Sequence, residues 1–130
     1  EEIGTHPAAN HNAISVALAF HRAIGAERKV ARLRWLRDRW ATQLLEEPDR
    51  VRVLTPLKGQ DAAAIGLVSV AGLDTSKLQG WLLDKHRIVT TPINHPQFSG
   101  LRITPNVYTT PDEVDLFADR VRQAMKQGLT

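Results

Sequence analysis

The chain has 130 residues, of which 42% are hydrophobic, 24% are charged and none is cysteine. This composition fits one globular domain, and it excludes a disulfide framework, a thiolate metal site and a cysteine nucleophile. The formal net charge is +3, and no apolar run approaches the roughly 20 residues of a membrane helix. We therefore predict a cytoplasmic protein without a membrane partner. The chain begins EEIGTHP, without a methionine or an apolar signal segment, so we expect it to be a piece of a longer protein.

Two helices are predicted in the first part of the chain. The first runs from Pro7 to Ile24, with His6 or Thr5 as its cap and Gly25 after its end. It carries a stripe of mostly small apolar residues, Ala13, Ala17, Phe20 and Ile24, which predicts close packing against a neighbour. The second helix is predicted over 26–46. Its residues with helical spacing are Leu33, Leu36, Trp40 and Leu44.

The second helix is rich in arginine, in the stretch AERKVARLRWLRDRW. A basic helix can bind nucleic acid, but it can also be a solvated helix face. The stretch contains Glu27 and Asp38 and has no RNA- or DNA-binding signature. We therefore prefer the solvated face, and we expect Trp35 and Trp40 to lie in the core or an interface.

The middle of the chain alternates short strands with a third helix. Four strands are predicted, at Val51–Thr55, around Leu67–Val70, at Ile88–Thr90 and at Leu101–Thr104. The strand around Leu67–Val70 is apolar on both faces, as a central strand would be. The third helix starts at Asp74 or Thr75, and INHPQFSG, with its two nearby prolines, is predicted to be a loop.

The last helix has the clearest local signal. Thr110, Pro111 and Glu113 form a capping box with proline at the first helical position. Its buried stripe is predicted to be Val114, Phe117, Ala118, Val121 and Met125. The order of elements predicts an α+β fold. A small, mostly antiparallel sheet carries helices on one face and is preceded by a long N-terminal helix pair.

Two places could bind an anion. Arg102 lies between Leu101 and Ile103 in a short strand, so its side chain points to the face opposite the core. It is either a solvent-facing strand arginine or a group that grips a carboxylate or phosphate with two parallel hydrogen bonds. Gly4 and Thr5 precede a predicted helix N-terminus, where free N–H groups favour an anion. An ordinary helix cap is the alternative there.

No residue pattern in this chain describes a complete active site. The five histidines include two that share a predicted helix, His11 and His21, which lie too far apart for one metal ion. His95 is the only one in a plausible pocket loop, although we prefer an ordinary surface loop there. No HExxH, GxSxG, P-loop or GxGxxG motif occurs. We therefore predict no metal site and name no catalytic residue in this chain.

The segments GTHPAANHNAISVALAFHRAIG and LRITPNVYTTPDEVDLF together resemble the C-terminal part of the class V aminotransferase family. These are fold-type-I pyridoxal-phosphate enzymes, among them cysteine desulfurases and isopenicillin-N-epimerase-like proteins. The resemblance covers nearly the whole chain, and the final segment is its most specific part. The family pattern there is a strand arginine followed by Tyr-Asn-Thr and an acidic helix start. Here Thr109 replaces the usual asparagine.

The resemblance assigns roles to three residues. It implies that Arg102 binds the α-carboxylate of an amino-acid substrate. It also implies that Gly4 and Thr5 contribute to the site of the pyridoxal-phosphate phosphate group held by the partner subunit of a homodimer. Residues 1–25 would then be a linking helix from a missing large domain, and residues 26–130 would be the small C-terminal domain.

The departures from the family pattern limit the activity. The Schiff-base lysine of the family follows a histidine, and no lysine in this chain does. The resemblance therefore implies that this lysine belongs to the missing large domain, and that the present chain alone is not active. The family's desulfurases need a cysteine in the loop before the arginine strand, and TPINHPQFSG has none. An aminotransferase, epimerase or lyase acting on an amino acid remains open. The alternative is a free-standing, non-enzymatic module for binding a small anion or nucleic acid, or for dimerisation.

Overall fold

The computed structural model describes residues 7–58 and 62–129. Its elements follow the predicted order of helix, helix, strand, strand, helix, strand, strand, helix, and the α+β fold class is confirmed. Their bounds are α1 Ala8–Ile24, α2 Ala26–Leu44, β1 Val51–Val53, β2 Gly66–Val70, α3 Thr75–His86, β3 Thr91–His95, β4 Phe98–Ile103 and α4 Pro111–Gln127.

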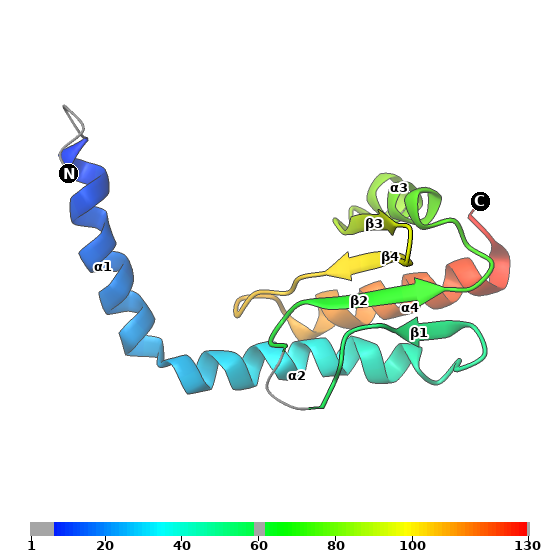
Figure 1. Cartoon of the computed structure of the whole chain (residues 1–130), viewed down its shortest axis with the longest axis horizontal. Coiled ribbons are helices and arrows are strands. Elements are labelled where there is room, and N and C mark those ends of the chain that lie inside the picture. The colour runs from blue at the N-terminus through cyan, green and yellow to red at the C-terminus, as the bar shows by residue number, and fades with distance from the viewer. Residues whose placement is uncertain (1–6, 59–61, 130) are drawn as a thin grey trace.

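The four strands form one antiparallel sheet in the order β1-β2-β4-β3 (Figure 1). In register, Val51 of β1 pairs with Val70 of β2. The next pair of strands places Val68 of β2 opposite Leu101 of β4. All four of these side chains are buried, because alternate residues of a strand point to the same face. The prediction that β2 is a central strand is therefore confirmed.

The core lies between this face of the sheet and the helices α2, α3 and α4. Trp40 of α2 is fully buried and meets Phe117 of α4 edge to face, with 5.9 Å between ring centroids. From α3, Leu78, Trp81 and Leu82 join the same cluster. The buried stripe predicted for the last helix, Val114, Phe117, Ala118, Val121 and Met125, is confirmed. Since the helices gather on one side, the other face of the sheet carries no helix from α2 onward.

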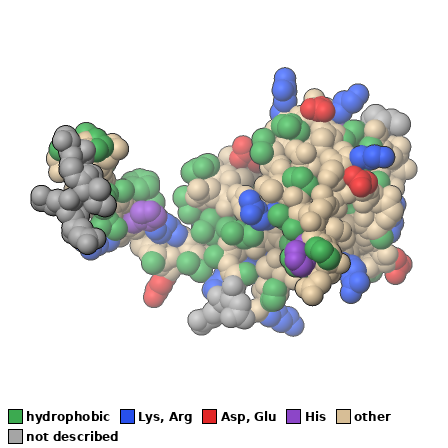
Figure 2. Space-filling model, turned by 45° about the horizontal axis from the view of Figure 1, so that its top comes forward, with side chains coloured by type: hydrophobic (Ala, Val, Ile, Leu, Met, Phe, Trp, Pro, Cys, Tyr) green, Lys and Arg blue, Asp and Glu red, His purple; other side chains and the backbone are tan. Residues whose placement is uncertain are grey.

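The N-terminal helix α1 projects away from this body (Figure 1). None of its residues is buried, and Val16 and Phe20 are 70% and 65% exposed. Figure 2 shows apolar side chains along the projecting segment. The predicted packing of α1 against a neighbour therefore does not occur within the described residues. Pro7 is the N-cap rather than the first helical residue and makes no side-chain cap hydrogen bond. The predicted caps, Thr5 and His6, lie outside the described residues.

The chain around the third strand differs from the prediction. Ile88–Thr90 is irregular, and the segment predicted to be a loop forms a β3–β4 hairpin in which His95 pairs with Phe98. The prediction of a loop was wrong because it relied on the two prolines in and beside this segment. Pro92 is tolerated because β3 is the edge strand of the sheet. Arg87, in the left-handed conformation at φ 58°, ends α3 just before this segment.

Arg37 departs from the solvated face predicted for the arginines of α2, whereas Arg28 is exposed and Arg32, Arg34 and Arg39 are partly exposed. Arg37 is 1% exposed, and its guanidinium donates to the carbonyls of Leu57 and Ala62, both at 3.0 Å. Its Nε donates to the exposed carboxylate of Asp38 at 2.8 Å. Arg37 therefore ties the segment after β1 to the middle of α2.

Candidate functional site

Arg102 lies on the open face of the sheet, as the strand alternation predicts. In register it stands between Leu67 of β2 and Thr91 of β3. Its neighbour Leu101 is buried in the core, whereas the side chain of Arg102 is exposed. A strand between two others fixes the direction of the side chain more firmly than a loop would, so the guanidinium is aimed away from this chain's helices.

The guanidinium of Arg102 keeps most of its hydrogen-bonding capacity. Its Nη2 reaches Thr91 Oγ1 at 3.4 Å, a long contact. Within residues 7–58 and 62–129, no carboxylate pairs with Arg102, whereas Arg37, Arg39 and Arg122 all have carboxylate partners. A guanidinium has five N–H donors, so Arg102 can still grip a carboxylate from outside the chain.

The surface around Arg102 is partly apolar. Leu67 and Ile93 lie on the same face as Arg102 by strand alternation. Phe98 is 44% exposed at the end of the hairpin, where it stacks on His95 with 4.6 Å between ring centroids. An anion bound by the arginine would therefore sit beside apolar side chains, which lower the local polarity and strengthen a charge-assisted hydrogen bond.

The other candidates that the sequence offered are Gly4, Thr5 and His95. Gly4 and Thr5 lie outside the described residues, so their predicted contact with a phosphate stays a prediction. His95, predicted to lie in a loop, is the last residue of β3 in the β3–β4 hairpin instead. In the part of the chain that the structure describes, no three His, Asp or Glu side chains gather as a metal site would require.

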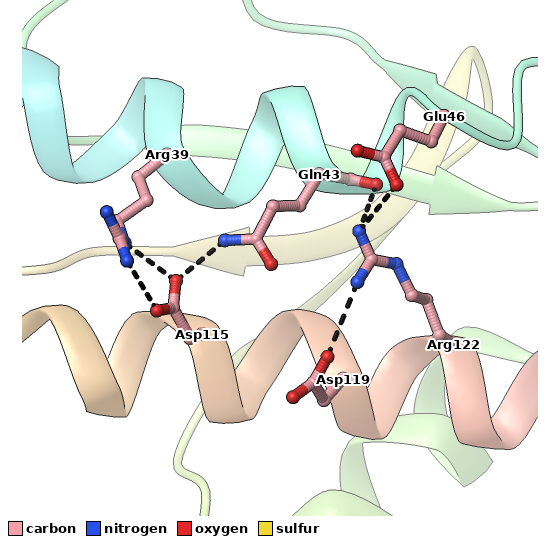
Figure 3. Close-up of polar contacts among 6 residues, drawn as sticks. All are labelled: Arg39, Gln43, Glu46, Asp115, Asp119 and Arg122. Atoms are coloured by element: carbon pink, nitrogen blue, oxygen red, sulfur yellow. Dashed lines mark hydrogen bonds and ion pairs between the residues drawn. The ribbon is translucent and has the colours of Figure 1, made fainter.

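The arginines on the α2–α4 side serve internal contacts (Figure 3). Arg39 of α2 donates two hydrogen bonds to Asp115 of α4, at 2.7 and 2.6 Å, and Gln43 donates a third at 2.7 Å. The hydrogen bonds from the Arg39 guanidinium lower the pKa of the Asp115 carboxyl, and the bond from Gln43 acts in the same direction. This cluster fixes the relative position of two helices.

A second contact lies further along the same two helices. Arg122 of α4 donates to the Gln43 carbonyl at 2.7 Å and pairs with Glu46 and Asp119, at 3.0 and 3.3 Å (Figure 3). Earlier in α2, Arg32 donates to the Thr109 carbonyl at 3.1 Å. These contacts engage the guanidinium groups of Arg32, Arg39 and Arg122 inside the chain.

The sequence did not indicate the cavity near the end of β4. It has a volume of about 560 Å³ and is lined by residues from α2, the end of α3, the segment around β4 and the start of α4. Two of its lining residues, His86 and Thr90, looked like ordinary ends of a helix and a strand. No spacing in the sequence could have indicated them, because they line one cavity with Trp40 only in the folded chain.

The chain is similar to a curated protein of Mycobacterium tuberculosis (strain CDC 1551 / Oshkosh), described as a probable hercynylcysteine sulfoxide lyase. The two are 34% identical over 123 residues, an alignment that covers 81% of this chain. The chain spans 28% of the length of that relative. No family model matches the chain. None of the helices described here has the length and apolar character needed to cross a membrane.

Proposed function

We propose that this chain is the small C-terminal domain of a pyridoxal-phosphate-dependent lyase, in which Arg102 binds the α-carboxylate of an amino-acid substrate. The observation that carries the proposal is the state of Arg102. It is exposed on the helix-free face of the sheet, lies on a strand held between two others, and has no carboxylate partner among the described residues. Its N–H donors are therefore open to a carboxylate from outside the chain.

The similarity to a probable hercynylcysteine sulfoxide lyase supports the broad family that the sequence resembles. It also favours a lyase over an aminotransferase or an epimerase among the activities that the sequence left open. The name of that relative describes a substrate derived from cysteine and oxidised at sulfur. We therefore propose an amino-acid sulfoxide as the substrate class, with cleavage of a bond to sulfur as the reaction.

The proposed reaction requires this domain to bind and orient the substrate. Pyridoxal phosphate, when bound, supplies the electron sink for bond cleavage at the substrate. The bond to be broken must stand at a defined angle to the cofactor ring, and a two-point grip on the carboxylate helps to set that angle. The planar guanidinium of Arg102 provides such a grip, because two of its N–H groups can donate in parallel to the two carboxylate oxygens.

The proposed enzyme also requires a large domain and a homodimer partner, neither of which is among the described residues. A large domain would supply the lysine that holds the cofactor and would face the open side of the sheet. The exposed apolar residues of α1 fit a helix that links the two domains and packs against that large domain or a homodimer partner. In this arrangement, Gly4 and Thr5 would contact the cofactor phosphate of the partner subunit.

The test substitutes Arg102 in the complete enzyme. We expect Arg102→Ala to raise KM for an amino-acid substrate by about 100-fold, since two charge-assisted hydrogen bonds contribute roughly 3 kcal/mol together. Arg102→Lys should recover part of this loss. The matched control is Arg52→Ala, which removes another exposed arginine, positioned on the same sheet face by its register with Ser69.

The decarboxylated amine analogue of the substrate gives the decisive comparison. It lacks the carboxylate, so Arg102→Ala should change its KM by less than about threefold. Equal losses for the amino acid and the amine would remove the proposed role of Arg102. A loss in Arg52→Ala as large as that in Arg102→Ala would show a general effect of surface charge.

A further inference from the structure

The open face of the sheet carries two aromatic rings in line with Arg102. His95 of β3 pairs with Phe98 of β4, and their rings stack with 4.6 Å between centroids and 24° between planes. Phe98 and Arg102 are four residues apart on β4, so their side chains project from the same face. At the other end of this strip of the face, Thr91 pairs with Arg102, and Thr91 Oγ1 contacts its Nη2 at 3.4 Å. We call His95 and Phe98 the ring pair.

The ring pair is accessible, and contacts within its own hairpin hold it. Phe98 is 44% exposed, and His95 is exposed as well. The imidazole Nδ1 accepts a hydrogen bond from the Gln97 backbone N–H at 3.2 Å, which holds the ring at the turn of the hairpin. A ligand on the open face can therefore reach both rings, and the stack that it meets is already formed.

An apolar floor joins the ring pair to Arg102. Gly100 lies midway between Phe98 and Arg102 on β4 and has no side chain to divide the strip. Ile93 pairs with Gly100 on one side. On the other side, Leu67 Cδ1 lies 3.3 Å from the position that a Cβ on Gly100 would take. Since Ile93 and Leu67 are partly exposed, the strip from the guanidinium to the ring pair offers apolar contact along its length.

The length of the strip fits a substrate that extends beyond its sulfur atom. Four residues of a strand span about 13 Å. In a cysteine derivative, three bonds separate the carboxylate carbon from the sulfur, a distance of about 4 Å. With the carboxylate on Arg102, the sulfur would lie over the apolar floor. The group attached beyond the sulfur is therefore the part that can reach the ring pair.

The charges along the open face favour an uncharged group at the ring pair. The ionisable residues at the strand positions of this face are Arg52, His95 and Arg102, and none of these positions carries a carboxylate. A cationic group there would find no acidic partner on the strands and would be repelled by the two arginines. A planar aromatic group can stack on the rings or meet their edges, and such contacts add to the effect of burial.

We propose that the ring pair binds an uncharged aromatic substituent on the sulfur of the substrate. This inference rests on the proposed function, because it takes the carboxylate on Arg102 as its fixed point. It narrows the substrate class to amino-acid sulfoxides with an aryl group on sulfur. His95 and Phe98 then determine specificity and take no part in bond cleavage.

The test measures the binding of two probes to the complete enzyme by calorimetry. The probes are β-phenylsulfinyl propanoate and β-methylsulfinyl propanoate, which lack the amino group and therefore cannot react with the cofactor. We expect the phenyl probe to bind at least about fivefold more tightly, because it also buries its ring. Phe98→Leu keeps an apolar side chain but removes the ring. It should weaken the phenyl probe by roughly three- to tenfold and change the methyl probe by less than about twofold.

Three further variants separate the possible causes. Phe98→Tyr keeps the ring and should retain the affinity for the phenyl probe. Leu54→Ala is the matched control, since Leu54 is 40% exposed just after β1, at the opposite edge of the sheet, and it should alter neither affinity. Arg102→Ala should weaken both probes alike, because both carry the carboxylate.

Two results would each overturn the inference about the ring pair. They are equal affinities of the two probes and an unchanged affinity for the phenyl probe in Phe98→Leu. If Arg102→Ala weakened neither probe, the proposed function itself would be wrong, so the two failures are distinguishable.

Discussion

The buried guanidinium of Arg37 gives the sharpest prediction about stability. Its side chain is 1% exposed, and it donates to the carbonyls of Leu57 and Ala62 and to the carboxylate of Asp38. Arg37→Met keeps a long apolar side chain in the same space but removes every donor. The segment after β1 then loses the hydrogen bonds that Arg37 donates to it.

The magnitude follows from what each acceptor loses. The Leu57 carbonyl loses its guanidinium partner, which costs about 1–3 kcal/mol for an unpaired buried acceptor. The Ala62 carbonyl keeps a hydrogen bond from Arg34 at 3.2 Å, so its loss is smaller. The folded Arg37→Met variant no longer bears the free-energy cost of desolvating a buried guanidinium, and this offsets part of the loss. We therefore expect Arg37→Met to lower the free energy of unfolding by about 2 kcal/mol.

The measurement is urea unfolding of the full chain at neutral pH, analysed by linear extrapolation. Asp38→Ala is the control, because it removes only the ion pair with an acceptor that is 47% exposed. Such a pair contributes about 0–1 kcal/mol. The reasoning is refuted if Arg37→Met is as stable as the wild type, or if Asp38→Ala costs as much as Arg37→Met.

Three further substitutions test other contacts in the same unfolding assay. Gly100→Ala should cost about 2–3 kcal/mol, because its new methyl group would lie 2.4 Å from the Val68 carbonyl oxygen; an undiminished stability would contradict this clash. Thr110→Ala should cost about 1 kcal/mol by removing the helix cap, and Thr110→Ser should restore most of it. Because hydrogen bonds from Arg39 lower the folded-state pKa of Asp115, this carboxyl stabilises the fold above its ordinary pKa and ceases to do so as the pH falls through the lowered value. Asp115→Asn should therefore reduce the loss of stability between pH 7 and pH 3, and an unchanged loss would refute this.

Elements whose signals are local could be predicted from the sequence. The capping box of Thr110 and Glu113 requires only residues three apart, and the structure forms it in both directions. The alternation of Leu101, Arg102 and Ile103 likewise predicted that the guanidinium would point away from the core. Local steric and hydrogen-bonding rules decide both features before any distant part of the chain is considered.

Elements whose signals depend on neighbours could not be predicted as well. The hairpin of β3 and β4 was missed because proline argues against a strand unless its position at the sheet edge is known. Arg37 was assigned to a solvated face, although it lies three residues before Trp40 and therefore shares its side of the helix. That spacing was visible, but the carbonyls that make its burial tolerable come from a distant segment.

The sequence by itself determined the order of the elements, the start of the last helix and the face on which Arg102 lies, since these depend on residues close together along the chain. The tertiary structure alone decided which arginines pair with carboxylates of this chain. Arg39 meets Asp115, and Arg102 meets no carboxylate of the described chain. It also decided that Trp40, His86 and Thr90 share one cavity. Contacts between residues far apart in the chain are set by how the helices pack on the sheet, and no local pattern records that packing.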